Sequence, residues 1–464
     1  MTTTPLKHGL HGRGLPGEEE QEGGLPRGSI AAIAVCSLGG TAFGYDLGAV
    51  SAATRGWLHA FQLSVPQLGV TVSASLWGGA AGSLLAGKLA HRCGRRPVLA
   101  GSAILYALAA IGLALVPAGR WPLLLLLRVL SGVAIGGFVV DCPLYLAEIS
   151  PRAWRGRVVG CFQLQIGAGV VLAFTAGALL SMLWPGPSLW RWFMALGALP
   201  PLCLLALLRW VPEEPHWLHA AGRPGQAERS AARLGIDPAE WLRSQNLLRG
   251  HAAPGSERLL QRKYLRPILL AISIAMFNQL SGVQIFRMYL LDLLSSAGMG
   301  HRSRDLYAVS ISVLSLAVTL TAVMLIDLRG RKPLLLAGSA GMGLCLVSLT
   351  LALRGHAHPG TLETILTAFN ACFAFSQGPM VWIYLSELFP FAVRGAGQGL
   401  GSLVHWLTSA SVILCFPLLQ RAAPSGVFLI FAAIMLLQVA IVARWYPETK
   451  GTPLGQLARE AIVS

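Results

Sequence analysis

Twelve windows of about 20 mostly apolar residues, separated by clusters of Arg, Pro or Gly, run along most of the chain. Each window predicts a membrane span, because a helix needs about 20 such residues to cross roughly 30 Å of hydrocarbon. The windows begin near Ser29, Leu68, Pro97, Trp121, Val158, Leu189, Pro267, Leu306, Pro333, Thr361, Ala392 and Ser425. The chain is 54% hydrophobic and only 12% charged, which is the balance of a membrane protein. The sequence therefore predicts an all-α membrane protein with twelve transmembrane helices.

The windows form two groups of six, separated by a polar interval. We expect a cytoplasmic tail over residues 1–28, a six-helix bundle over 29–210, a cytoplasmic linker with short helices over 211–266, a second six-helix bundle over 267–446 and a tail over 447–464. The first tail is rich in Gly, Pro and Glu and lacks the order of a cleaved signal peptide, so we predict that it is disordered.

The formal net charge of +16 would suggest nucleic-acid binding in a soluble protein. Here the basic residues lie mainly in short connections, for example Arg95 and Arg96 after the second window and Arg331 and Lys332 after the eighth. Positive residues in short loops mark the cytoplasmic side of a membrane protein. We therefore expect a multi-pass protein of the plasma membrane, the inner membrane if the cell is bacterial, with both termini cytoplasmic and no nucleic-acid partner.

Three motifs occur once in each half. HRCGRRP at 91–97 returns as DLRGRKP at 327–333, YLAEISPRAWRG at 145–156 as YLSELFPFAVRG at 384–395, and VPEEP at 211–215 as YPETK at 446–450. The offsets are 236 residues (91 to 327), 239 (148 to 387) and 235 (212 to 447). Such agreement indicates parallel repeats related by an axis along the membrane normal. This architecture places a substrate site between the halves and works by rocking one half against the other.

Acidic and basic residues accompany these motifs at the predicted helix ends of both halves. We predict that they form a cytoplasmic latch, which must break when that side opens. Its members are Arg92, Arg95, Arg96, Glu148, Arg155, Glu213, Arg331, Glu387, Arg394 and Glu448. The alternative is that the arginines only orient the chain, but orientation requires no matching acids.

Taken together, the motifs resemble the sugar porter family of the major facilitator superfamily, which includes facilitative glucose transporters and bacterial proton–sugar symporters. The resemblance runs from about residue 43 to 451 and is carried by QLSG at 279–282, SELFP at 386–390, PEEPHWLHAAGR at 212–223 and YPETKG at 446–451. It implies the twelve-helix major facilitator fold and transport of a monosaccharide, a hexose or pentose, by alternating access. We expect the protein to work as a monomer in the lipid bilayer.

Some positions depart from the family pattern. His91 stands where the family has an acid or amide, PEEPH replaces PESPR, Asn278 replaces the first amide of QQLSG, and Gln284 replaces an Asn. These changes keep hydrogen-bonding capacity at the predicted site. Ser315 and His405 replace amides of the eighth and eleventh spans, so the identity of the sugar stays open.

The resemblance implies that Gln163, Gln279 and Gln284 bind the sugar, with Asn278 as a fourth amide. A carboxamide can accept and donate hydrogen bonds to neighbouring hydroxyls, and it is buried at less cost than an ion. Further predicted members of the site are Trp382, Trp406, Phe373, His405 and Ser315. An indole offers a flat apolar face to a pyranose and an N–H to a hydroxyl. The alternative for each amide is a hydrogen bond between helices.

Asp46 lies within the first window and Arg128 within the fourth, both in the predicted outer half. An ionisable residue inside a span is a functional hypothesis by default. In the symporters that the chain resembles, this pair couples transport to protons, whereas uniporters tend to have a neutral residue there. Protonation of Asp46 would release Arg128 and shift the balance between the two states. The alternative is a permanent structural ion pair.

Two further charges have several interpretations. Arg287 is expected to snorkel, to pair with Asp292, to compete for Asp46 or to bind an acidic sugar such as a uronate. Asp141 is a second candidate proton site.

The eight Cys residues have no metal-type spacing and no disulfide framework. No nucleotide-binding motif and no catalytic pair stands out, so we expect no cofactor and no enzyme. The rival functions are a facilitative uniporter of the same fold and a transport-silent sugar receptor.

Overall fold

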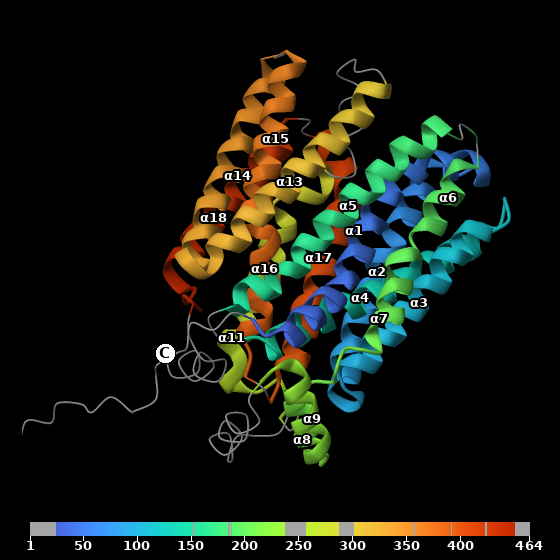
Figure 1. Ribbon diagram of the computed structural model, residues 1–464. Coiled ribbons are helices and arrows are strands. Elements are labelled where there is room, and N and C mark those ends of the chain that lie inside the picture. The colour runs from blue at the N-terminus through green and yellow to red at the C-terminus, as the bar shows by residue number, and fades with distance from the viewer. Residues whose placement is uncertain are drawn as a thin grey trace, which may run out of the picture.

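The computed structural model describes residues 25–151, 154–183, 186, 188–236, 257–286, 301–355, 358–390, 392–422 and 425–450. These residues fold into long, roughly parallel helices, and the ranges just given contain no strand (Figure 1). Residues 1–24 of the tail predicted over 1–28 and residues 451–464 of the tail predicted over 447–464, together with Arg287 and Asp292, lie outside the described residues.

The first half contains six helical segments that run along the bundle. They are α1 (Arg27–Phe61), α2 (Val65–Cys93), α3 (Arg95–Leu115), α4 (Trp121–Glu148), α5 (Arg155–Leu183) and a sixth segment made of α6 (Leu189–Leu196) and α7 (Leu199–Leu208). Gly94 separates α2 from α3 with φ +94°, a conformation that favours glycine. Pro200 and Pro201 lack the N–H that would continue the hydrogen-bond ladder, which explains the break between α6 and α7.

The second half repeats this plan. It consists of η2 (Arg262–Tyr264), α11 (Leu265–Leu280), α13 (His301–Arg329), α14 (Arg331–Arg354), α15 (Pro359–Phe375), α16 (Gln377–Glu387), α17 (Arg394–Ala422) and α18 (Gly426–Trp445). Gly330 joins α13 to α14 with φ +89°, as Gly94 does in the first half. The predicted tenth window is broken at Ser376, which is fully buried, into α15 and α16.

Ten segments of the described chain are long and apolar enough to cross a membrane. The two predicted spans that fall short are the broken pair α15–α16 and α17. Both stay inside the bundle, because α17 packs along α2 and α16 along α5. Polar side chains lower the hydropathy of α17, and four of them, Gln398, Ser402, His405 and Ser409, are at most 3% exposed. Polar residues in a span face protein rather than lipid, so these two helices are the ones expected at an interior site.

The two halves meet along two helix pairs, α2 with α17 and α5 with α13. A Cβ added at Gly87 would lie 2.7 Å from the carbonyl oxygen of Gly395, so the backbones of α2 and α17 approach closely there. On the other pair, a Cβ at Gly156 would lie 2.3 Å from Asp327 Oδ1. Both close contacts lie at the end of the bundle beside the linker helices α8 (Pro215–Ala220) and α9 (Pro224–Leu234) (Figure 1). We call this end the linker end.

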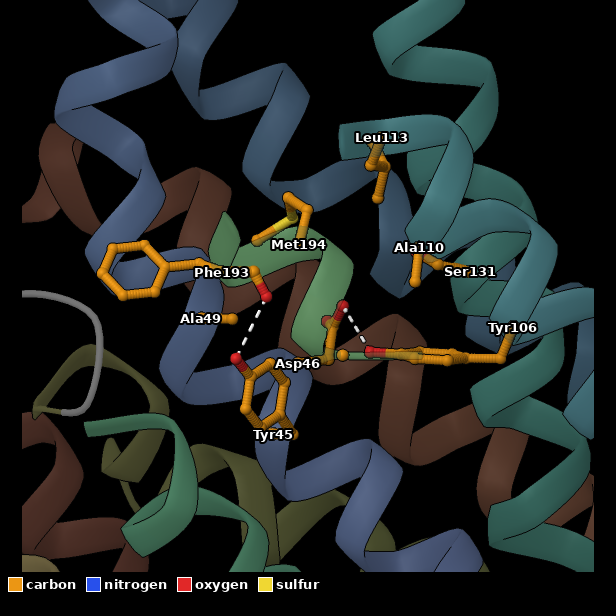
Figure 2. A pocket seen from close by; sticks show the side chains of 10 residues that line it. Tyr45, Asp46, Ala49, Tyr106, Ala110, Leu113, Ser131, Phe193 and Met194 are labelled. Atoms are coloured by element: carbon orange, nitrogen blue, oxygen red, sulfur yellow. Dashed lines mark hydrogen bonds between the residues drawn. The ribbon is translucent and has the colours of Figure 1, made fainter. Parts of the chain in front are cut away.

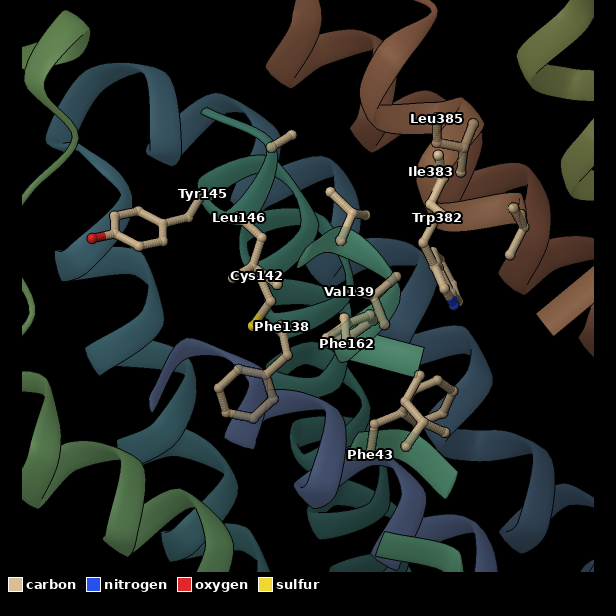
Figure 3. Close-up of a cluster of buried hydrophobic side chains, with 14 of the residues drawn as sticks. Phe43, Phe138, Val139, Cys142, Tyr145, Leu146, Phe162, Trp382, Ile383 and Leu385 are labelled. Carbon is tan, nitrogen blue, oxygen red and sulfur yellow. The ribbon is translucent and has the colours of Figure 1, made fainter. Parts of the chain in front are cut away.

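A hydrophobic cluster continues the contact between the halves toward the middle of the bundle. Phe162 of α5 meets Trp382 of α16 edge to face, with ring centroids 5.8 Å apart. Figure 3 shows Phe43, Phe138 and Phe162 of the first half beside Trp382 of the second. Burial of such rings contributes stability without charge, so this cluster helps to hold the two halves together in the middle of the bundle.

Candidate functional site

Polar side chains of both halves gather where the hydrophobic cluster ends. Gln163 of α5 accepts a hydrogen bond from the indole Nε1 of Trp382 in α16 at 2.9 Å. The two side chains are buried, at 7% and 3% exposure. This bond therefore joins the halves through a predicted sugar ligand and a predicted aromatic wall.

Gln279, the next amide, lies near the end of α11. Its Nε2 is 3.0 Å and 3.3 Å from the two ring nitrogens of His405 in α17 and 2.8 Å from Oδ1 of Asn278. Its Oε1 is buried and has no hydrogen-bond partner among the described residues. A buried acceptor without a protein partner is rare, and it is a group that a ligand hydroxyl can satisfy.

Three aromatic rings form the wall beside Gln279. The rings of Trp382 and His405 are 5.1 Å apart, and those of His405 and Trp406 are 5.4 Å apart. Trp406 also meets Phe43 of the first half at 5.3 Å. The indole Nε1 of Trp406 is buried without a partner in the described part of the chain. Gln279 of α11 and Trp406 of α17 thus carry one buried acceptor and one buried donor without a partner among the described residues.

Asn278 has a structural role in this conformation. Its Nδ2 donates to the backbone carbonyl of Gln377 at 2.9 Å, and its Oδ1 accepts from Gln279. Gln377 begins α16 directly after the break, and its own Nε2 donates to Ser339 at 3.2 Å and to Gln438. Asn278 and these residues form a buried network that holds the broken span. The sequence analysis missed Gln377 and Gln438; an amide beside the Gly-Pro pair at 378–379 was the available signal.

The other predicted sugar contacts have different surroundings. Gln284 is 4% exposed and follows Gly282, whose φ of +84° interrupts the helix after Leu280. Phe373 lies close to Gln163, because a Cβ added at Gly378 would be 3.5 Å from Phe373 and 3.2 Å from Gln163. Ser315 is different: it accepts a hydrogen bond from Asn370 of α15 and donates to Ile311. The structure therefore ties Ser315 to the contact between α13 and α15. None of its hydrogen bonds among the described residues reaches Gln163 or Gln279.

Asp46 and Arg128 form an ion pair inside the first half. Arg128 Nη1 is 2.9 Å from Asp46 Oδ1, and the side chains are 1% and 8% exposed. Tyr106 donates to the same carboxylate oxygen at 3.3 Å, and Arg128 Nη2 donates to Ser75 at 2.6 Å. Trp57 covers the guanidinium at 5.6 Å. The carboxylate is thus held by one cation and one hydroxyl in a nearly dry setting.

A small cavity adjoins Asp46 (Figure 2). It is about 10 Å³, which is room for one water molecule. Tyr45, Tyr106 and Ser131 supply polar groups to its lining, and Tyr45 donates to the carbonyl of Phe193 at 3.1 Å. A water in this cavity could form a hydrogen bond with the carboxylate of Asp46.

Asp141 in α4 is fully buried, and neither of its carboxyl oxygens has a hydrogen-bond partner within the described ranges. The positive charge of Arg95 attracts the Asp141 carboxyl, and Arg95 Nη1 also lacks a partner in those ranges. An unpaired buried carboxylate is very costly, so this geometry favours the neutral form of Asp141.

The predicted latch residues divide into caps, pairs within a half and contacts between halves. Glu213 accepts from the backbone N–H of Arg95 at 2.9 Å, and Glu448 accepts from that of Arg331 at 2.9 Å. Each acid therefore caps the first turn of a helix, α3 or α14, in its own half. Since this is a bond within one half, opening the linker end need not break it.

Three buried ion pairs near these helix ends also lie within single halves. Arg95 binds Glu148 through two hydrogen bonds of 2.7 Å and 3.0 Å. In the second half Arg331 is 3.2 Å from Glu387 and 2.8 Å from Asp327. These pairs fix the helix ends of each half as rigid units.

Asp327 of α13 joins the two halves at the linker end. Asp327 Oδ2 accepts from the backbone N–H of Arg157 in α5 at 2.9 Å. Arg394 of α17 interacts with Glu148 of the first half, and Arg155 is buried at the start of α5. Arg96 donates to the carbonyl of Leu208 within its own half at 3.1 Å, and Arg92 is exposed. The sequence analysis did not include Arg157 and Asp327 in the latch, although Asp327 lies in a repeated motif and Arg157 directly follows one.

Comparisons with known proteins agree with this geometry. The family model described as sugar (and other) transporter matches residues 32–461. The chain is 32% identical to the putative metabolite transport protein YwtG of Bacillus subtilis, over 91% of this chain and 93% of that protein. It is 31% identical to the glucose transporter GlcP of Staphylococcus epidermidis, over 91% and 95%.

Solved structures of XylE have the same fold. The proton:xylose symporter XylE bound to 6-bromo-6-deoxy-D-glucose superposes with a TM-score of 0.85 at 26% identity, over 93% of this chain and 98% of that chain. The inward open conformation of XylE from E. coli superposes with a TM-score of 0.75 at 26% identity, over 93% and 99%. The expectations of a major facilitator fold and of a transporter rather than an enzyme are confirmed. The chain is a multi-pass membrane protein and belongs to the sugar transporter family.

Proposed function

We propose that the protein transports a monosaccharide by alternating access and couples this transport to protons. The observation that carries the proposal is the buried site between the halves, where Gln279 Oε1 and Trp406 Nε1 have no hydrogen-bond partner among the residues that the structure describes. A sugar hydroxyl can donate to the first and accept from the second. Relatives named as a glucose transporter and a proton:xylose symporter support this substrate class.

The amides and rings suit a neutral polyol better than an ion. None of Gln163, Gln279 and Trp382 carries a charge, and all three are buried. Moving an ion into such a site would be costly, whereas a sugar exchanges hydrogen bonds with water for bonds with carboxamides. The indole and imidazole faces can cover the C–H side of the ring.

Proton coupling rests on the Asp46–Arg128 pair. A proton on Asp46 would weaken its attraction to Arg128 and leave that cation with Ser75 and the Trp57 ring. Since the pair joins α1 to α4, its rupture can change the packing of the first half and bias the two states. A facilitative uniporter is the alternative, in which the pair stays closed throughout.

We infer that this conformation is closed at the linker end and that this end faces the cytoplasm. The close contacts Gly87–Gly395 and Gly156–Asp327 support the closure. The lower TM-score against inward open XylE, 0.75 compared with 0.85, agrees with it. The Arg-rich loops at this end support the orientation, with both termini in the cytoplasm. We further propose that the protein lies in the plasma membrane and works as a monomer.

The test is uptake into proteoliposomes of a panel of labelled hexoses, pentoses and uronates, with and without an imposed pH gradient. We expect concentrative uptake of a neutral sugar only with an inward proton gradient. Uptake that only equilibrates in both conditions would favour the uniporter, and binding without uptake would favour a receptor. Preference for uronates would assign Arg287 to substrate recognition.

A further inference from the structure

A second cavity, far larger than the one beside Asp46, lies at the linker end of the first half. Its volume is about 450 Å³, which is in the range of ligand sites. It is enclosed by the start of α3, the end of α7 and the linker helices α8 and α9. The proposed sugar site and the proton site do not contribute to its lining.

The polar part of the lining is strongly basic. Arg96, Arg209 and Arg223 line the cavity, and Glu213 is the acid among its lining residues. The oxygens of Glu213 already accept hydrogen bonds from the backbone at the start of α3. Arg209 rests on the ring of Trp210 at 4.0 Å, which orients its guanidinium. Three guanidinium groups against one engaged carboxylate make a site for an anion.

One part of the apolar lining comes from two membrane spans, and Trp217 and Leu218 of α8 supply another part. Pro97 and Ala100 belong to the span Arg95–Leu115, and Leu205 and Leu208 to the span Leu189–Leu208. The cavity therefore straddles the ends of two spans, where hydrocarbon gives way to headgroups. Exposed apolar side chains continue along both helices, for example Ile104 and Leu108 on α3, at 50% and 64% exposure.

We propose that this cavity binds the headgroup of an anionic phospholipid, with the phosphate on the arginines and the acyl chains along α3 and α7. A guanidinium pairs with phosphate through two parallel hydrogen bonds, and basic pockets between helices on the cytoplasmic side suit such headgroups. The amphipathic lining selects a lipid over a free phosphate ion, because a free ion would leave the apolar part of the cavity unused.

The lipid would connect the linker to the first half. Trp217 of α8 lines the cavity and donates its Nε1 to the carbonyl of His91 at the end of α2. Arg223 stands at the N-cap of α9, whereas Arg96 belongs to α3. A phosphate held by arginines of both elements would fasten α8 and α9 against the bundle.

The experiment measures lipid binding to the purified full-length protein by native mass spectrometry. Dioleoylphosphatidylglycerol is titrated into detergent solutions of the wild type and of Arg209→Gln/Arg223→Gln, with dioleoylphosphatidylcholine as the neutral lipid. The matched control is Arg229→Gln/Arg258→Gln, which removes the same charge from two exposed linker arginines that do not line the cavity.

We expect the cavity variant to bind phosphatidylglycerol roughly thirtyfold more weakly, because each arginine near an anionic headgroup contributes roughly fivefold. The control should bind as the wild type does, and phosphatidylcholine should bind all three proteins equally. Equal loss in both double variants would overturn the proposal, since it would show attraction to net charge alone. Competition by millimolar inorganic phosphate would assign the cavity to a small anion instead of a lipid. Equal melting temperatures without lipid establish that the variants are folded.

Discussion

The two halves of the protein share one scaffold and differ in their polar interiors. Glu213 caps α3 as Glu448 caps α14, and Arg95 pairs with Glu148 as Arg331 pairs with Glu387. Inside the spans, the first half carries the Asp46–Arg128 ion pair, whereas the second carries an uncharged network around Asn278, Gln279, Gln377 and Gln438. The repeated parts fix each half as a rigid unit, and the parts that differ separate the proposed proton chemistry from the proposed sugar chemistry.

We expect the largest effect of a single substitution at Asp46, which tests whether the first half carries the proton chemistry. Asp46→Asn removes the charge that holds Arg128, so uphill accumulation of sugar should be lost while exchange of sugar across the membrane continues. Proteoliposome uptake with a pH gradient, and counterflow without one, measure the two activities. Concentrative uptake at the wild-type level would show that Asp46 is only structural. Asp141→Asn is the comparison: if that variant loses accumulation and Asp46→Asn does not, the coupling carboxyl lies in α4.

A substitution at Gln279 tests whether the second half carries the sugar chemistry. Gln279→Ala deletes hydrogen bonds to the sugar and should weaken its affinity at least tenfold, about 1.4 kcal/mol, without altering the requirement for a proton gradient. Sugar titrations followed by isothermal calorimetry give the affinity. Gln165→Ala is the matched control, because this amide accepts from Thr41 within the first half at 2.7 Å. If Gln279→Ala binds the sugar as tightly as Gln165→Ala does, Gln279 serves only to hold helices together.

Closure at the linker end depends on contacts between halves, and Asp327 can test it. Asp327→Asn weakens the contact with Arg157 and with Arg331, so the linker end should open more often, by a several-fold factor. Hydrogen exchange should then rise in residues 83–90 of α2 and 395–402 of α17. Arg92→Gln, at an exposed position of the same end, should leave exchange unchanged. Unchanged exchange in Asp327→Asn would mean that the glycine contacts alone keep the end closed.

The smallest expected effect concerns Glu214, a linker residue without a charged counterpart in the second half, where Thr449 follows Glu448. Burial, together with repulsion from Glu148, raises the pKa of Glu214 to about 8. The folded state thus binds a proton that the unfolded state has released, so stability is fully present below pH ~4.5 and falls as pH rises toward 8.

Glu214→Gln should remove this dependence while keeping an acceptor for the N–H groups of His216 and Trp217. The melting temperature of the wild type should therefore fall relative to the variant between pH 6 and pH 9, by on the order of 2 °C. Parallel melting curves across this range would contradict the predicted protonation.

Length, periodicity and repeated motifs were enough to predict the spans, the two related halves and a site between them. The reason is that only helices or closed barrels can span a bilayer, so the spans are long apolar segments. Polar residues within these segments are rare and easy to identify. The resemblance to sugar porters then selected Gln163 and Gln279 as sugar-binding residues, and Trp382, His405 and Trp406 as further members of the site, before any contact was known. Their roles as sugar ligands stay predictions, as does the division into domains.

Only the tertiary structure decided which partner each polar group meets. In the structure Glu213 and Glu448 cap helices, and Asn278 binds the broken span. Ser315 accepts a hydrogen bond from Asn370. Asp327 contacts Arg157 of the other half. Sequence spacing gives the depth of a residue in the membrane, but the rotation of each helix and the break at Ser376 depend on packing. The basic cavity likewise exists because α3, α7 and the linker helices converge, and residues 96, 209 and 223 are too far apart in sequence to reveal it.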